Sequence, residues 1–425
     1  MSDKYLDRTC DKLLREKLES KGAVLVKGAK WCGKTTTAAH MAKSVIYMED
    51  PSKKKQYLQL ADTDPVRLLD GEVPHLIDEW QLAPKLWDAV RFEVDRRDDF
   101  GQFILTGSAV PADQSEISHT GTGRITSLVM RPMTLYESGD SEGSVSLRAL
   151  FSKERTISGT SDHNLEDIAY LTCRGGWPKS IGKSRRVALA QAPDYYDAVV
   201  ESDISRVDDV ARNPERAKRI MRAYARSVAS EATIASILRD VRMDETDTFS
   251  ETSLRSYLSA LRKIFVIEDT PAWNPNLRSK TAIRSSDTRY FVDSSIATAA
   301  LGLGPNDLIN DLSTAGLFFE NLCVRDLRVY AEAIGGSVYH YRDKNGLECD
   351  AVIHLKNGRY GLIEIKLGGD RLIEEGAKNL LKLRDRIDYE KMSEPSFMMV
   401  LCGVAPFAYK RSDDVCIVPI GCLRD

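Results

Sequence analysis

A glycine, lysine and threonine pattern near the N-terminus has the residue types needed to hold a polyphosphate. The stretch from Gly28 to Thr35 fits the spacing G-x-x-x-x-G-K-[ST]. Glycines let the backbone curl so that its N–H groups surround the anion, the lysine reaches the terminal phosphates, and the threonine hydroxyl binds magnesium. The pattern predicts an ATP-binding loop formed by Gly28, Gly33, Lys34, Thr35 and Thr36, in which Thr35 also binds Mg²⁺.

Two acidic residues follow a second apolar stretch. His75-Leu76-Ile77 leads directly into Asp78 and Glu79. An acid at the end of a strand can hold a magnesium ion while its neighbour polarises water, so we predict Asp78 as a metal ligand and Glu79 as the catalytic base. The alternative is a strand end with two solvated acids.

A third apolar stretch, "QFILTGSA", ends in Thr106-Gly107-Ser108. A polar side chain at this position can sense the γ-phosphate or position the attacking water. Thr106 and Ser108 can instead simply cap a turn.

A second group of charged residues lies near the C-terminus. Asp350 begins one predicted strand, and Glu364 and Lys366 share a face of the next, after a helix that carries Glu320. Two carboxylates can bind magnesium beside a phosphodiester while a lysine orients water, which predicts Asp350 and Glu364 as metal ligands and Lys366 as a catalytic residue. A hairpin with a surface Lys–Glu pair is the alternative.

These residues need elements to position them. Residues 1–150 alternate between strand and helix patterns, which predicts an α/β unit with a largely parallel sheet. The predicted strands are 23–26, 45–48, 75–77, 103–106 and 125–130, and the predicted helices are 34–44 and 85–95.

Three further parts follow this unit. Residues 151–214 have a helical pattern broken at Arg174, and we interpret them as a lid or linker in which Arg174 either points at phosphate or is solvated. Residues 215–305 combine a helix, a turn, a helix and a strand, which predicts a winged-helix module. Its last helix carries an apolar stripe formed by Leu254, Tyr257, Leu258, Leu261, Ile264 and Phe265. Residues 306–425 form the fourth part.

The segment 255–290 is locally basic, with seven Lys/Arg against three Asp/Glu. This charge predicts DNA as a partner, bound mainly through phosphates. The side chains assigned to these contacts are Arg255, Arg262, Lys263, Arg278 and Lys280. A helical module that contacts protein is the alternative.

Composition limits the remaining classes. The 425 residues have a formal net charge of −3, so the whole chain is not a polycation. Its eight cysteines are scattered without zinc spacing, and no run of 18 apolar residues is present. We therefore expect a reduced, cytoplasmic protein without a membrane span.

The motifs together resemble a known family, the prokaryotic AAA-type ATPases with a C-terminal DUF4143 domain. The resemblance rests on the phosphate loop, "LIDEWQLAP", "FILTGSA", "GRITSLVMRPMTLYESG", "CRGGWPKS", "RYFVDSSIATAALG", "FFENLCVRDLRVYA", "GLECDAVI" and "GLIEIKLG". It implies an α/β P-loop ATPase with a helical lid, a winged-helix region and a C-terminal α/β domain of the PD-(D/E)XK, restriction-nuclease-like type.

The resemblance also implies roles for single residues. Ser108 matches a phosphate sensor, Arg124 is the best candidate for an arginine finger, and Arg131 is the second candidate. Asp350, Glu364 and Lys366 match a nuclease-like signature, but no glutamine directly follows it. The C-terminal site is therefore expected either to cut nucleic acid or only to bind a partner.

Three functions are consistent with these features. We favour an Mg²⁺-dependent ATPase whose nucleotide cycle controls the winged-helix and nuclease-like parts on DNA, with a homo-oligomer implied if Arg124 acts on a neighbour. The alternatives are an ATP-dependent DNA nuclease in defence or mobile-element control, and a nucleotide-gated protein-interaction switch without nuclease activity.

Overall fold

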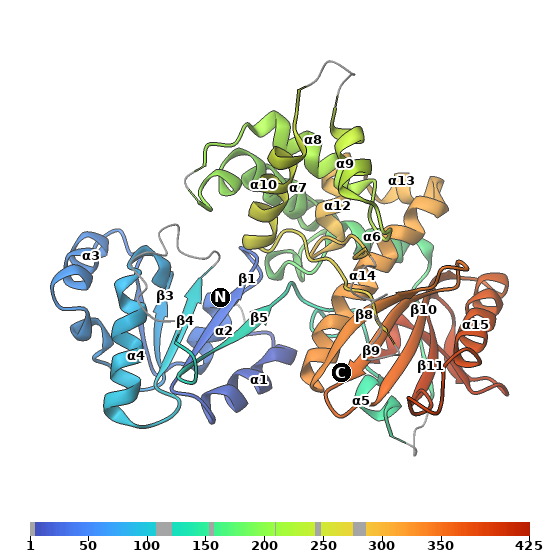
Figure 1. Ribbon diagram of the computed structural model, residues 1–425, viewed down its shortest axis with the longest axis horizontal. Coiled ribbons are helices and arrows are strands. Elements are labelled where there is room, and N and C mark those ends of the chain that lie inside the picture. Colours follow the sequence, from blue (N-terminus) through green and yellow to red (C-terminus); the bar gives the residue numbers. More distant parts are fainter. Residues whose placement is uncertain (1–4, 108–120, 153–156, 209, 243–247, 275–285) are drawn as a thin grey trace. The chain divides into compact units, whose positions relative to one another are not determined.

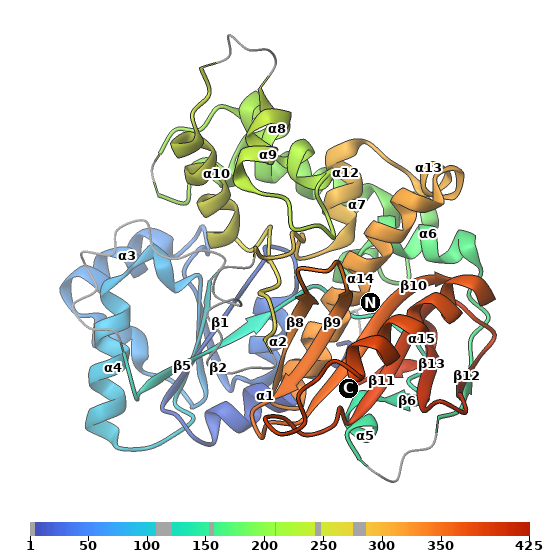
Figure 2. The ribbon, with the colours of Figure 1, turned by 45° about the vertical axis from the view of Figure 1, so that its right-hand side comes forward.

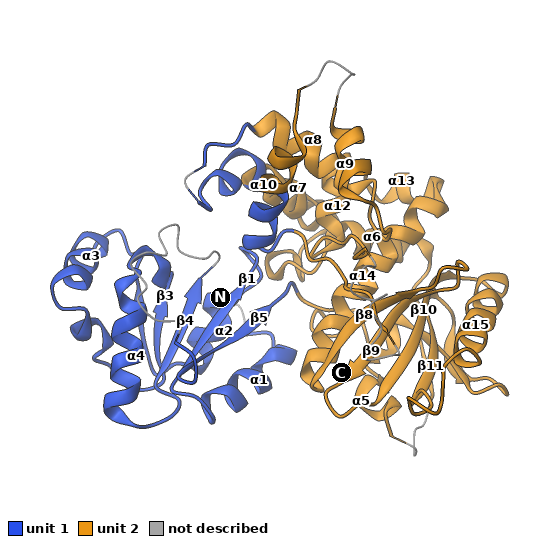
Figure 3. Ribbon diagram, in the orientation of Figure 1, with its two compact units in different colours: residues 1–132, 199–213, 258–266 blue, residues 133–198, 214–257, 267–425 orange. Residues whose placement is uncertain are grey.

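The computed structural model describes residues 5–107, 121–152, 157–208, 210–242, 248–274 and 286–425 (Figure 1). Ser108, Arg278 and Lys280 were predicted to contact ligands and lie outside these ranges. The chain forms two compact units, each assembled from several segments (Figure 3). Unit 1 holds Met1–Pro132, Val199–Asn213 and Leu258–Val266, and unit 2 holds Met133–Ala198, Pro214–Tyr257 and Ile267–Asp425.

A parallel five-stranded sheet forms the centre of unit 1. Its strands are β1 (Ala23–Gly28), β2 (Ser44–Tyr47), β3 (His75–Asp78), β4 (Phe103–Gly107) and β5 (Ile125–Met130), in the order β2-β3-β4-β1-β5. Every residue of β3 and β4 is buried, as is typical of inner strands in a parallel sheet. The α/β fold predicted for the N-terminal part is confirmed.

The helices of unit 1 that flank this sheet are α1 (Thr9–Leu18), α2 (Lys34–Met41), α3 (Lys54–Thr63) and α4 (Lys85–Arg97). On α4, Leu86, Val90 and Val94 recur every four residues and join the core beneath the sheet. The sequence predicted α2 and α4 but not α1 and α3.

Unit 2 begins with short elements and then becomes mainly helical. Its described α-helices before the long C-terminal ones are α5 (Leu147–Leu150), α6 (Leu165–Arg174), α7 (Arg185–Glu201), α8 (Pro214–Ala225), α9 (Ile234–Val241), α10 (Glu251–Lys263), α12 (Ser294–Leu301) and α13 (Pro305–Asn310). The ends of α7 and α10 extend into the segments of unit 1. The predicted apolar stripe of α10 is buried at Leu254, Tyr257, Leu258, Leu261 and Ile264.

A short pair of extended segments follows α10. Antiparallel bridges join Ile267 to Phe291 and Thr270 to Thr288. The sequence predicted a helix, a turn, a helix and a strand in this part, and the structure has the three helices α8, α9 and α10 before the extended pair. The tip of the pair lies outside the described residues.

The C-terminal part of unit 2 is a mixed seven-stranded sheet (Figures 1 and 2). Its strands are β7 (Gly159–Thr160), β8 (Gly336–Arg342), β9 (Glu348–Leu355), β10 (Tyr360–Gly368), β11 (Phe397–Val404), β12 (Phe407–Lys410) and β13 (Val415–Pro419), in the order β7-β12-β13-β11-β10-β9-β8. Helices α14 (Leu312–Ala333) and α15 (Asp370–Arg384) pack on it, and Figure 2 shows α15 lying across β10 and β11. A tight turn at Lys356-Asn357-Gly358 joins β9 to β10.

Residues just after Pro132 take part in the C-terminal fold. Strand β6 (Val145–Ser146) pairs in parallel with β14 (Leu423–Arg424), and β7 pairs with β12. The predicted boundary at residue 150 therefore differs from the boundary between the two units. The difference arises because these pairings join residues that are distant in sequence, which local patterns do not reveal.

Candidate functional site

The loop between β1 and α2 requires its glycines. A Cβ atom on Gly28 would lie 2.0 Å from the carbonyl oxygen of Met130 on the neighbouring strand β5. Gly33 has φ of 102°, in the left-handed region that L side chains avoid. The close approach of β5 and the turn into α2 together explain why glycine occupies both positions.

Lys34 begins α2 and points into the curl of this loop. Its Nζ donates hydrogen bonds to the carbonyl oxygens of Gly28, at 3.0 Å, and Ala29, at 2.8 Å. The N-terminal end of α2 presents backbone N–H groups at the same place, which favours an anion. The ammonium group is thus inside the loop that is predicted to surround the phosphates.

Three side chains from different elements meet at the end of β3. Oδ1 of Asp78 accepts hydrogen bonds from Thr35 Oγ1, at 2.7 Å, and from Thr106 Oγ1, at 2.5 Å. Carboxyl ends of neighbouring parallel strands converge on one edge of a sheet, which brings β3 and β4 to the start of α2. A threonine hydroxyl next to a carboxylate is a donor set that suits Mg²⁺ bound to a nucleotide.

Glu79 follows Asp78 and has the left-handed backbone conformation, with φ of 58°. Burial raises the pKa of the Glu79 carboxyl, an effect that the hydrogen bond from Gln81 and the charge of Lys34 partly oppose. A carboxylate with a raised pKa is a stronger base toward water. Its backbone strain and its raised pKa are both features of functional positions.

Gln81 is a residue that the sequence analysis did not assign. Its Nε2 donates a hydrogen bond to Glu79 Oε2. A Cβ atom at residue 107 would lie 2.5 Å from Gln81 Oε1, so a side chain in place of Gly107 would push the Gln81 amide from its present position. The motif "LIDEWQLAP" contained Gln81, but sequence spacing alone does not show that it turns back onto Glu79.

The two arginine candidates lie at opposite ends of strand β5, because Arg124 precedes this strand and Arg131 follows it. Arg124 precedes β5 beside the start of β1, and its carbonyl oxygen accepts a bond from Ala23 N. Five residues of β1 separate this edge from the loop, or about 17 Å at 3.3 Å per residue. The Arg124 guanidinium pairs with Asp95 at 2.7 Å. Arg124 therefore does not join the nucleotide site of its own chain.

Arg131 lies on the nucleotide edge, because Met130 before it pairs with Gly28. Arg8, which is 7% exposed, connects the nucleotide loop to the residue that follows β5. Its Nη1 donates to the carbonyl oxygen of Cys32, at 2.9 Å, and its Nη2 donates to that of Arg131, at 2.8 Å. The sequence analysis missed Arg8, since it lies outside the motif and acts only through the folded backbone.

Three charged residues of the C-terminal sheet, Asp350, Glu364 and Lys366, lie close together. Lys366 Nζ is 2.7 Å from Oε2 of Glu364 and 3.3 Å from Oδ2 of Asp350. The same Asp350 oxygen accepts a hydrogen bond from the backbone N–H of Ile365, at 2.7 Å. The Lys366 ammonium thus stands between two carboxylates, where a cation would balance their charge.

A further acid on α14 joins this cluster. Tyr290 donates a hydrogen bond of 2.5 Å to Oε1 of Glu320. Burial, and next the charge of Asp350, raise the pKa of Glu320 well above its usual value. The same two causes raise the pKa of Glu364 to about 8.

The cluster fits a cation in one respect and lacks a metal arrangement in another. Glu364 Oε1 is buried and has no hydrogen-bond partner within the described part of the chain. One lysine therefore does not satisfy all the acid oxygens, and a divalent ion that binds Asp350 and Glu364 would neutralise them. Among the residues that the structure describes, no group of three or more His, Cys, Asp or Glu is arranged to hold a metal.

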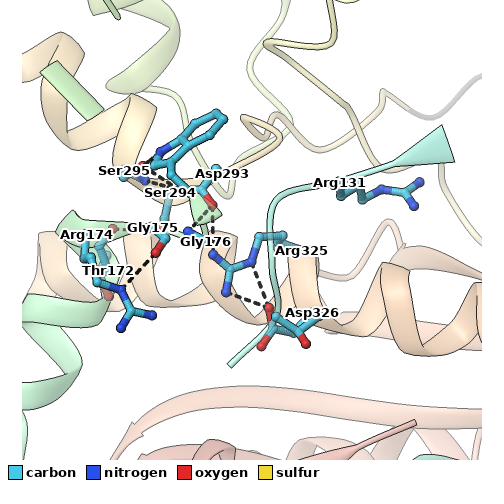
Figure 4. A network of polar contacts seen from close by, with 12 residues as sticks. Arg131, Thr172, Arg174, Gly175, Gly176, Asp293, Ser294, Ser295, Arg325 and Asp326 are labelled. Atoms are coloured by element: carbon cyan, nitrogen blue, oxygen red, sulfur yellow. Dashed lines mark hydrogen bonds and ion pairs between the residues drawn. The ribbon is translucent and has the colours of Figure 1, made fainter. Parts of the chain in front are cut away.

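A buried ion network ties α14 to the helical part of unit 2 (Figure 4). Arg325 is 2.8 Å from Asp293 Oδ2 through Nη1 and 2.7 Å from Asp326 Oδ1 through Nη2. Asp293 also accepts from the backbone N–H of Gly176, at 2.9 Å, and Asp326 accepts from that of Leu135, at 2.9 Å. Four separate stretches of the chain are joined by these three side chains.

Arg174, the phosphate candidate of the predicted lid, belongs to the same region. It is 5% exposed and pairs with Asp140 at 2.6 Å. Its guanidinium is thus occupied by a structural ion pair.

Comparison with known proteins gives matches over most of the chain. Residues 20–138 match a family model described as an AAA domain, and residues 315–423 match a domain of unknown function, DUF4143. Residues 165–307 match another domain of unknown function, DUF8612.

The described residues contain no helix with the length and apolar character to cross a membrane.

Individual relatives are distant. Uncharacterized proteins of Mycobacterium bovis (Mb2031c) and Mycobacterium tuberculosis (Rv2008c) are each 26% identical over 358 residues, which cover 83% of this chain and 72% of theirs. Among solved structures, the Walker-type ATPase PABY2304 of Pyrococcus abyssi is similar with a TM-score of 0.45 and 15% identity, covering 71% of this chain and 97% of its own.

The N-terminal match and the nucleotide-site geometry define the class, and the chain is an AAA-type ATPase. Residues 315–423 add a DUF4143 domain, so the chain combines the two domains that the sequence motifs predicted.

Proposed function

We propose that ATP binding and hydrolysis in unit 1, with Mg²⁺ held by Thr35 and Asp78, control a winged-helix-like module and a restriction-nuclease-like C-terminal domain that act on DNA. The observation that carries the proposal is the meeting of Asp350, Glu364, Lys366 and Glu320 in a chain that also has an ATPase site. The direct test is ATP hydrolysis measured with and without double- and single-stranded DNA. Equal rates under all conditions would contradict control by DNA.

The winged-helix assignment is supported by the order of α8, α9, α10 and the bridged pair that follows. Two of the proposed DNA-contacting side chains have acidic neighbours. Arg255 pairs with Glu251 at 2.6 Å, and Lys263 is 3.9 Å from Asp208. Both basic side chains are more than 40% exposed, so these pairs are weak enough to be exchanged for phosphates.

We predict that the double variant Arg262→Glu/Lys263→Glu binds DNA more weakly and with a smaller salt dependence. Each phosphate contact contributes a slope of about −0.9 to log affinity against log salt, so the loss of two contacts is measurable in a titration. A matched control reverses Arg371 and Lys378, two exposed basic residues of α15. Unchanged affinity and slope in the first variant would favour the protein-interaction function.

The nuclease-like assignment of the C-terminal domain is supported by the mixed sheet and the acid–lysine cluster on β9 and β10. We predict that Asp350→Ala lowers the affinity for Mn²⁺ by at least about 10-fold, as expected for a lost metal contact. The measurement is Mn²⁺ titration by electron paramagnetic resonance. Glu348→Ala is the control, because Glu348 lies on the same strand and pairs with the exposed Arg342 at 3.3 Å.

The same variants test DNA cleavage in Mg²⁺ and Mn²⁺ with ATP present. Cutting by the parent and by Glu348→Ala, but not by Asp350→Ala, would favour the ATP-dependent nuclease. Cutting by no protein would favour a nucleotide-gated switch whose C-terminal domain only binds a partner. That second function has its own support, because Lys366 already stands where a metal would balance the two acids.

We propose Arg124 as an arginine finger that acts between subunits. Since Arg124 lies at the far edge of its own sheet, it can serve only the nucleotide of a neighbouring subunit. This role requires a homo-oligomer, which sedimentation with and without ATP tests. A monomer in both conditions would exclude it, and Arg131 at the nucleotide edge is the alternative within one chain.

We also propose a cytoplasmic location, consistent with the eight free cysteines of the structure.

A further inference from the structure

The nucleotide loop carries a second lysine that is bound to an acid from a distant segment. Lys30 lies between Gly28 and Gly33, and its Nζ is 2.6 Å from Oδ1 of Asp203. The Asp203 side chain is 10% exposed, whereas the Lys30 side chain is 44% exposed. A protein carboxylate therefore lies beside the loop that is expected to surround a polyphosphate.

Asp203 belongs to the segment of residues 199–213, here called the bend, which comprises the end of α7 and the residues after it, with residue 209 outside the described residues. This bend belongs to unit 1, although the residues on either side of it belong to unit 2 (Figure 3). Arg212 closes the bend, because its Nη1 donates to the carbonyl oxygen of Ile204, at 2.9 Å, and to Asp208 Oδ1, at 2.7 Å. The bend is thus stabilised from within, and the Lys30–Asp203 pair joins it to the nucleotide loop.

A carboxylate at this place has opposite interactions with the loop and with its ligand. It attracts Lys30, but it repels any phosphate chain that enters the loop beside Lys34. Lys30 has an exposed, flexible side chain with three donors, so it can turn from a carboxylate to a phosphate oxygen. Asp203 and the phosphates of ATP are alternative partners of the same ammonium group.

We infer that Asp203 competes with nucleotide phosphates for Lys30, and that ATP binding releases residues 199–213 from the loop. The inference rests on nucleotide binding by the loop and adds a segment that responds to it. The chain runs from this bend directly into α8 at Pro214, the first helix of the proposed winged-helix module. Release of the bend gives the nucleotide cycle a covalent route to that module.

The two partners are expected to have opposite effects on nucleotide affinity. Asp203→Asn removes the competing charge and keeps the shape, so it should raise the affinity for a fluorescent ATP analogue by about 5-fold, the lower end of typical coupling between sites. Lys30→Met removes an attractive charge and should lower the affinity by a similar factor. A pair with only a structural role would move both affinities in the same direction.

Asp62→Asn is the matched control, because Asp62 forms a Lys–Asp pair of 2.8 Å with Lys85 elsewhere in unit 1. Limited trypsin cleavage after the exposed Arg206 reports on the bend. A non-hydrolysable ATP analogue should accelerate this cleavage in the parent protein. Asp203→Asn should be cleaved fast even without it, and Asp62→Asn should behave like the parent.

Two results separate failure of this inference from failure of nucleotide binding. If the parent binds the analogue and Asp203→Asn binds it no more tightly, the competition is wrong. Cleavage after Arg206 that does not respond to the analogue would also overturn the release of the bend. If neither the parent nor Asp203→Asn binds the analogue, the nucleotide loop itself is wrongly assigned and the inference falls with it.

Discussion

Replacement of Glu79 by glutamine is expected to leave ATP binding intact and to slow hydrolysis by about 10² to 10⁴-fold, the usual contribution of one catalytic base. The carboxylate is needed only when water attacks, because it accepts the proton, whereas the phosphates are held by the loop. Burial raises the pKa of Glu79 and so suits it to this task. Gln81 fixes one of its oxygens, which leaves the other for water.

Lys34→Ala is the companion experiment and should act at an earlier step. The Lys34 ammonium lies inside the loop, within 3.0 Å of two loop carbonyl oxygens. Its loss removes the positive charge that the bound phosphates require. We expect no measurable binding of a fluorescent ATP analogue by Lys34→Ala and parental binding by Glu79→Gln. Hydrolysis by Glu79→Gln at the parental rate would show that another group prepares the water.

Replacement of Arg325 by methionine is expected to lower the free energy of unfolding by about 3 to 5 kcal/mol, the cost of leaving buried carboxylates without their cation. Arg325 and the two aspartates are at most 1% exposed, so water does not replace the lost contacts. Burial raises the pKa of Asp326 to about 6 even with Arg325 in place. Without the arginine, Asp293 and Asp326 would repel each other inside the protein.

Urea denaturation followed by circular dichroism measures this loss. Arg371→Met is the control, because Arg371 is 86% exposed and only 3.9 Å from Glu375, so its removal should change stability little. The triple variant in which Asp293 and Asp326 are also asparagine should recover part of the loss, since no unpaired charge remains. A midpoint for Arg325→Met equal to that of the control would mean that the network does not stabilise the fold.

The nucleotide edge could be predicted closely because its signals are local. Gly33, Lys34 and Thr35 are consecutive in the sequence. Asp78 and Glu79 directly follow apolar residues that predict a strand. Each motif then reaches its place through the simple rule that parallel strands end at one edge. The same rule shows why Arg124 was harder to place, since its position depends on the direction of β5 rather than on its neighbours in sequence.

Contacts between distant segments escaped prediction. Arg8 supports the loop from outside the motif. Asp293 and Asp326, the two partners of Arg325, accept hydrogen bonds from the backbone of distant segments, at Gly176 and Leu135. Glu320 was noticed on its helix, but its bond to Tyr290 depends on how α14 lies against the extended pair after α10. Side-chain patterns show which face of an element is buried, and they do not show which distant partner covers it.

The contacts of Arg8 affect how this protein can be dissected into fragments. The AAA match begins at residue 20, yet Arg8 holds both the loop at Cys32 and the strand end at Arg131. A fragment trimmed to the matched range would lose this support while keeping every motif residue. Weak ATP binding by such a fragment would therefore be uninformative about the motif, and expression work on the ATPase part should retain the first helix together with the residues that precede it.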